Sequence, residues 1–163
     1  MINKKGFTLI ELLIVIGIIA VLMAIAVVAI NPGRQFAKAN NARRWGDVSA
    51  IANAISLKII EEKGLWIPSG DCEDLLAWTG ADVALADDPT DDDAIVDICD
   101  CLTPAYLGSF PLDPTTSTAP AALPCTGYDS GYEISRNAAG RVTISAPLSQ
   151  DEGSGAPTIS VTR

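Results

Sequence analysis

Residues 7–30 read FTLIELLIVIGIIAVLMAIAVVAI, an almost uninterrupted apolar run in a chain of 163 residues. At 1.5 Å rise per residue, these 24 residues form about 36 Å of helix, enough to cross a hydrocarbon core about 30 Å thick. Lys4 and Lys5 precede the run, and by the positive-inside rule they keep the N-terminus in the cytoplasm. The sequence therefore predicts one membrane-spanning helix, with everything after it outside the cytoplasm.

A secretory signal peptide explains this segment poorly, because the apolar run is long and no small-x-small cleavage site follows it. A small residue, Gly6, instead lies directly before the run, and Glu11 interrupts its first turns. A carboxylate there costs about 2–3 kcal/mol on insertion unless it has a partner. Cleavage after Gly6 would create an α-amino group at Phe7, four residues before Glu11. We expect that amine to pair with Glu11, within one helix or between stacked copies.

The string KKGFTLIELL at residues 4–13 resembles the N-terminal signature of type IV prepilins and of the related pseudopilins of type II secretion. The resemblance implies that residues 1–6 form a cytoplasmic leader, that prepilin peptidase cuts after Gly6 and methylates the new terminus at Phe7, and that Glu11 guides assembly. It also implies four partners: further copies of the chain in a homopolymer, the prepilin peptidase/N-methyltransferase, a membrane assembly platform and, before assembly, the lipid bilayer.

Residues 31–64 continue the helical pattern beyond the apolar run. Asn31-Pro32-Gly33 predicts a kink or an unwound stretch, and a simple helix end at the membrane surface is the alternative. An apolar stripe at three- and four-residue steps then predicts an amphipathic stem that packs on a globular head, with Gly64 as its stop. The stripe comprises Phe36, Trp45, Val48, Ala52, Ile55 and Ile59. The basic residues Arg34, Lys38, Arg43 and Arg44 lie just beyond the membrane, where they face lipid headgroups or the acidic heads of neighbouring subunits.

Residues 65–127 are predicted to form a loop-rich, acidic connecting region. Seven aspartates lie between residues 87 and 100, a density that suits either a solvated loop or Ca²⁺, although the spacing is not that of an EF-hand. Residues 105–114, AYLGSFPLDP, resemble the connecting region of pilins and major pseudopilins, where a short helix leads into a turn before the sheet.

The four cysteines, Cys72, Cys99, Cys101 and Cys125, all follow the apolar run. An even count outside the cytoplasm favours two disulfides, whereas a zinc site usually shows paired C-x2-C knuckles, which are absent here. A bridge between Cys99 and Cys101 would be strained. We therefore expect Cys72 to pair with one of these two and Cys125 with the other.

Alternating apolar and polar residues predict strands in residues 128–163, at 132–135, 141–145 and 158–162, with a turn at 137–140. The predicted fold class is α+β: a long N-terminal helix packed on a small antiparallel sheet of about three or four strands, which is the type IV pilin fold that the resemblance implies.

Composition excludes several functions. Residues 66–163 carry sixteen acidic and three basic residues, so this part repels nucleic acid. The chain has no histidine and no phosphate loop, dinucleotide motif or nucleophile elbow, so we expect neither an enzyme nor a cofactor.

The leading hypothesis is a pilus subunit, anchored in the cytoplasmic membrane before assembly and on the cell surface afterwards. The alternatives are a pseudopilin or minor pilin, and a membrane-tethered binding domain that never polymerises.

Overall fold

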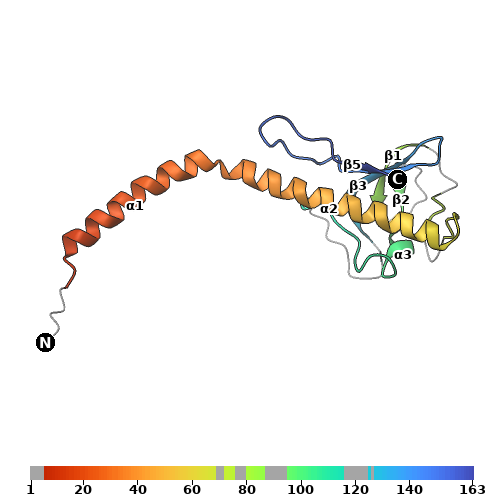
Figure 1. Cartoon of the computed structure of the whole chain (residues 1–163), viewed down its shortest axis with the longest axis horizontal. Helices are drawn as coiled ribbons and strands as arrows, with labels where there is room; N and C mark the ends of the chain where they lie inside the picture. The colour runs from red at the N-terminus through yellow and green to blue at the C-terminus, as the bar shows by residue number, and fades with distance from the viewer. Residues whose placement is uncertain (1–5, 69–71, 76–79, 87–94, 116–124, 126) are drawn as a thin grey trace. The chain divides into compact units, whose positions relative to one another are not determined.

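The computed structural model of the chain describes residues 6–68, 72–75, 80–86, 95–115, 125 and 127–163 (Figure 1). It divides into two compact units, Met1–Phe36 and Ala37–Arg163. Lys4 and Lys5 of the predicted leader, the acidic residues between 87 and 94, and the Pro/Thr/Ser/Ala-rich residues 116–124 lie outside the described residues.

The first unit consists mainly of helix α1, Leu9–Ile30, drawn red to orange in Figure 1. It begins two residues later than predicted because Thr8, in an extended conformation, is its N-cap. None of its 22 residues is buried, and the helix is about 33 Å long. By length and composition α1 meets the requirements of a membrane-spanning helix.

The chain departs from helical hydrogen bonding at Asn31, between α1 and helix α2, Pro32–Glu61. Asn31 has a left-handed backbone, with φ 46° and ψ 79°. Pro32 has no N–H to continue the pattern of α1, and the Arg34 N–H donates to the Asn31 carbonyl at 3.1 Å to start the next helix. The interruption lies where the sequence predicts a kink or an unwound stretch.

Helix α2 provides one wall of the core of the second unit. Its buried face follows helical steps of three and four residues from Ala37 to Lys58. The predicted stripe is correct for Val48, Ala52 and Ile55, and wrong for Phe36 and Trp45, which are 70% and 42% exposed. Each of these aromatic residues is adjacent in sequence to a residue of the buried face. Because successive residues of a helix are about 100° apart, the aromatic side chains point away from that face. The full buried face is Ala37, Asn41, Arg44, Val48, Ile51, Ala52, Ala54, Ile55 and Lys58.

Helix α2 is followed by a turn with left-handed backbone at Lys63 (φ 60°) and Gly64 (φ 89°). The Gly64 N–H donates to the Ile59 carbonyl at 2.7 Å, a bond that closes the last helical turn in the manner of a glycine stop. Gly64 therefore has the role that the sequence predicts for it.

The second wall is a five-stranded sheet in the order β2-β1-β3-β4-β5. The strands are β1, Gly80–Ala86; β2, Ile95–Val96; β3, Asp129–Arg136; β4, Val142–Ser145; and β5, Ser160–Thr162. Strands β1 and β2 pair in parallel, and the other three pairings are antiparallel. Ile134, Ile144 and Val161 lie opposite one another across β3, β4 and β5, which aligns one apolar face.

The sheet has more strands than the three or four predicted, because β1 and β2 fall in the region predicted to be loop-rich. A short helix, α3, Cys99–Leu102, lies in the same region. The core between α2 and the sheet includes Ile51, Leu85, Ile98 and Ile134, each with no exposed surface. The architecture is a helix packed on a mostly antiparallel sheet, the predicted α+β class.

Candidate processing and assembly site

The bond between Gly6 and Phe7 lies directly before α1. Residues 6–8 are not helical, and all three are exposed, with Phe7 at 82%. An exposed, irregular segment of this kind is the type of backbone that a peptidase can bind and cut. The geometry at Gly6 and Phe7 is therefore compatible with cleavage, which remains a prediction.

Thr8 holds the Glu11 carboxylate at the start of α1. The Thr8 backbone N–H donates to Glu11 Oε2 at 3.0 Å, and the Thr8 hydroxyl donates to the same oxygen at 2.8 Å. In return, the Glu11 N–H donates to Thr8 Oγ1 at 3.3 Å. This reciprocal arrangement is a capping box, and it also places a negative charge at the positive end of the helix dipole.

Thr8 is a residue that the sequence reasoning missed. The signal was present, because Thr8-Leu9-Ile10-Glu11 has the threonine-x-x-glutamate spacing of a capping box. The described residues place no hydrogen-bond donor on the second carboxylate oxygen, Oε1. That oxygen is available to an amine from the cleaved terminus or from another copy.

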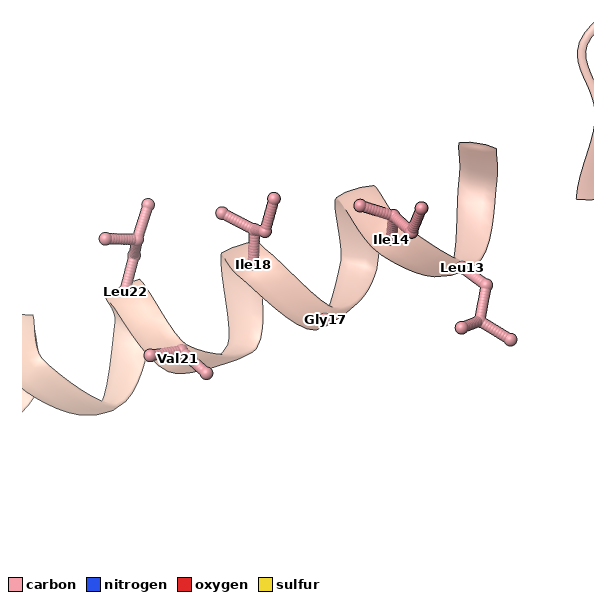
Figure 2. Close-up of a pocket in the computed structure, with 6 residues that line it drawn as sticks. All are labelled: Leu13, Ile14, Gly17, Ile18, Val21 and Leu22. Atoms are coloured by element: carbon pink, nitrogen blue, oxygen red, sulfur yellow. The ribbon is translucent and has the colours of Figure 1, made fainter. Parts of the chain in front are cut away.

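The surface of α1 is apolar and uneven. Figure 2 shows Ile14, Ile18 and Leu22 pointing to one side of the helix, with Leu13 and Val21 lower in the view. Together with Gly17 these residues line a shallow hollow. A Cβ at Gly17 would meet nothing within 4 Å, so the hollow is open rather than filled by this chain. A surface of this kind packs equally well against lipid or against a similar helix.

Two disulfides connect the region between α2 and β3. Cys72 is bonded to Cys101, and Cys99 to Cys125, with Cα–Cα distances of 5.7 and 5.8 Å. The pairing is one of the two that the sequence leaves open, and it excludes a tetrathiolate zinc site. Both bridges end on α3, so this four-residue helix is fastened to the chain on either side of it.

A buried ion pair fastens α2 to the segment that follows α3. Arg44 donates from Nε to Asp113 Oδ2 at 2.6 Å and from Nη2 to Oδ1 at 2.9 Å. Both side chains have no exposed surface, which corrects the expectation that Arg44 is one of the exposed basic residues beyond the membrane. Burial alone raises the pKa of the Asp113 carboxyl, but the hydrogen bonds from Arg44 and Thr115 outweigh it and leave that pKa below its usual value.

Asn41 extends this network to the connection between β4 and β5. Its side-chain amide donates to the Gln150 carbonyl at 2.7 Å and to Glu152 Oε1 at 2.9 Å, while its Oδ1 accepts from the Gln150 N–H at 2.9 Å. The same oxygen accepts from Arg44 Nη1 at 2.9 Å. One buried face of α2 thus anchors two separate loops of the second unit.

The described part of the chain contains no group of three or more His, Cys, Asp or Glu that could hold a metal ion. Most of the aspartates considered for Ca²⁺ lie between residues 87 and 94, outside the described residues. The candidate site therefore consists of the junction at Gly6 and Phe7, the capping box of Thr8 and Glu11, and the exposed apolar surface of α1.

Comparison with known proteins bears on this same end of the chain. Residues 1–27 match the family model of the prokaryotic N-terminal methylation motif, the signature of type IV pilins and prepilins. No curated protein and no solved structure matches the chain. The chain is therefore type IV pilin-like or pseudopilin-like in its N-terminal motif, and this motif is structural rather than enzymatic.

Proposed function

We propose that the protein is a structural subunit of a type IV pilus filament, cleaved after Gly6, methylated at Phe7 and polymerised through α1. The observation that carries the proposal is the methylation motif on a helix with no buried residue. A 22-residue apolar helix that its own chain leaves uncovered needs either lipid or other helices around it. A membrane precursor and a filament provide these two environments in turn.

Glu11 gives this polymer its register. Contacts between apolar helices have similar energies at many axial offsets. A carboxylate in a low dielectric instead interacts strongly with one charged partner, so its energy depends on the offset. Oε2 of Glu11 is already bonded to Thr8, and Oε1 is left for the α-amino group of Phe7 in a neighbouring copy. Pairing at that oxygen would select one offset among the many that the apolar surface permits.

The same features fit a pseudopilin of type II secretion or a minor pilin, since the motif is shared. Long surface fibres favour the pilus subunit, and a short periplasmic structure favours the pseudopilin. A membrane-tethered binding domain is the alternative of another class, and it requires neither cleavage nor polymerisation. If the protein is a pilus subunit, the leader stays in the cytoplasm and the second unit is exported across the membrane. Assembly then moves the subunit from the bilayer into a filament on the cell surface.

The test replaces Glu11 by alanine in the native cell. We expect Glu11→Ala to insert and to be cleaved like the wild type, while the yield of filaments falls at least tenfold. The matched control is Leu12→Ile, on the next residue of the same exposed helix, which keeps filament yield. Normal filaments from Glu11→Ala would contradict the role of the carboxylate in assembly.

A further inference from the structure

We infer that Arg34, Phe36 and Lys38, the collar, bind the headgroups of anionic phospholipids in the leaflet where α1 ends. The inference rests on the proposed function in one respect, namely that α1 spans the membrane. It adds a ligand class, an anionic lipid phosphate, and assigns it to residues outside the methylation motif, which ends at residue 27.

The position of the collar in the chain places it at headgroup depth. Arg34 and Lys38 are the fourth and eighth residues after Ile30, the last residue of α1. Four helical residues advance about 6 Å and eight about 12 Å, and even a fully extended chain spans at most about 14 Å over four residues. The headgroup layer is about 5–8 Å thick on each side of the hydrocarbon core. Over this whole range of distances the long side chain of Arg34 can reach the headgroup layer, and Lys38, four residues further along the same helix, lies on the same face as Arg34.

The cations of the collar have no polar partner in the described part of the chain. Arg34 and Lys38 are exposed, and neither side chain forms an ion pair or a hydrogen bond with any residue that the structure describes. The next two cations along α2 differ, because Arg43 lies 3.6 Å from Asp47 and Arg44 is buried against Asp113. Of the four cations between residues 34 and 44, Arg34 and Lys38 are therefore the two that have no carboxylate partner among the residues that the structure describes.

Phe36 strengthens the case for a lipid surface. It lies between the two cations in sequence and is 70% exposed, so it adds an apolar group to a basic segment. Cationic side chains combined with an exposed phenylalanine are typical of segments that lie in the membrane interface. An acidic surface on a second copy would also attract the cations, but it would leave the phenyl ring without an apolar partner. Continuity with the span and the opposite charge of lipid phosphate therefore favour the bilayer.

This contact would fix the depth of the subunit before assembly. Breaking it is then part of extracting the subunit, because the cations leave the phosphates when α1 leaves the lipid. Binding of anionic lipid by the collar would therefore stabilise the membrane-embedded subunit relative to the subunit in the filament.

The experiment measures binding of phosphatidylglycerol to the full-length protein in detergent micelles by native mass spectrometry. The variant is Arg34→Gln/Lys38→Gln. One cation near a lipid surface contributes about fivefold in affinity, so we expect the Kd for phosphatidylglycerol to rise about 25-fold. Affinity for zwitterionic phosphatidylcholine should change less than twofold. Arg34→Lys/Lys38→Arg keeps both charges and should keep wild-type affinity.

The matched control is Lys63→Gln/Arg141→Gln. Both residues are exposed, and Lys63 follows the far end of α2, about 35 Å along the helix from Lys38. An unchanged Kd in Arg34→Gln/Lys38→Gln, or an equal rise in the control, overturns the inference. If filament yield falls while lipid affinity is unchanged, the cations contact a second copy and the inference is likewise overturned. Lipid binding is measured on single subunits, so absence of cleavage or filaments would refute the proposed function without affecting this result.

Discussion

The Arg44 guanidinium and the Asp113 carboxylate form a two-bond ion pair with no exposed surface, although 69 residues separate them in the chain. Arg44 lies in the middle of α2, and Asp113 lies in the segment that leads towards β3. Asn41 and Thr115 accept hydrogen bonds from the same guanidinium at 2.9 Å, so each of its three nitrogens donates to a partner. The pair therefore fastens the stem helix to the rest of the second unit.

Removing one member of this pair should be severely destabilising. We expect Arg44→Met to lower the free energy of unfolding by about 3–5 kcal/mol, because it leaves the Asp113 carboxylate buried without its counter-ion. Arg43→Met is the matched control, since Arg43 lies on the neighbouring position with an exposed side chain and a long 3.6 Å contact to Asp47. Its effect should stay below about 1 kcal/mol. Urea unfolding of the full chain in detergent, followed by circular dichroism, measures both, and equal losses would contradict the role of the buried pair.

The pair should also make stability depend on acid pH. The folded-state pKa of Asp113 is below its ordinary value of 3.8, so folding favours the ionised form. The resulting stability is fully present above the unfolded pKa and is lost as the pH falls through the folded pKa. We expect the Tm of the wild type to exceed that of Asp113→Asn most at pH 6–7, with the gap narrowing below about pH 4. A gap that is constant from pH 7 to pH 3 would show that the charge of Asp113 has no such effect.

Each disulfide should contribute measurably to stability. The sequence separations are 29 residues for Cys72–Cys101 and 26 for Cys99–Cys125. Closing loops of this length in the unfolded chain is worth about 3–4 kcal/mol in the chain-entropy description. We expect Cys72→Ser/Cys101→Ser and Cys99→Ser/Cys125→Ser to lose similar amounts, measured by urea unfolding after alkylation has confirmed the remaining bridge. If reduction of the wild type leaves its unfolding curve unchanged, the bridges do not stabilise this fold.

The Thr8 hydroxyl should matter for Glu11 but less than the carboxylate itself. Thr8→Val removes the hydroxyl bonds and keeps the backbone N–H bond to Glu11 Oε2, so part of the cap survives. Loss of an N-cap side chain costs about 0.5–2 kcal/mol. We expect filament yield from Thr8→Val to lie between those of the wild type and Glu11→Ala, at equal precursor levels. Thr8→Ser keeps the hydroxyl and serves as the control, with wild-type yield.

The sequence predicted the long elements well because their patterns are strong. An apolar run of 24 residues has one physical solution in a membrane, and the stop at Gly64 follows from local backbone preference alone. Strands β3 and β4 alternate clearly around a short turn. Strand β1, GADVALA, is rich in small residues with little strand propensity, and β2 has two residues, so neither gives a readable period.

The burial of Arg44 could not be predicted from its neighbours. In sequence it is one of four cations within eleven positions, and nothing local distinguishes it from Arg43. Its partner is Asp113, one of sixteen acidic residues in the second part of the chain, and the choice among them is made by tertiary packing. For the same reason, a helical stripe read from apolar residues alone included Phe36 and Trp45 and omitted Asn41 and Arg44.

In the proposed function, the chain is cleaved at the junction before α1 and then assembled. Intact-mass and N-terminal peptide mass spectrometry of the mature protein from its native membrane tests it most directly. We expect a chain that begins at N-methylated Phe7, with residues 1–6 removed. A mature chain that still begins at Met1 would contradict it, because the Phe7 amine that should pair with Glu11 would then not exist.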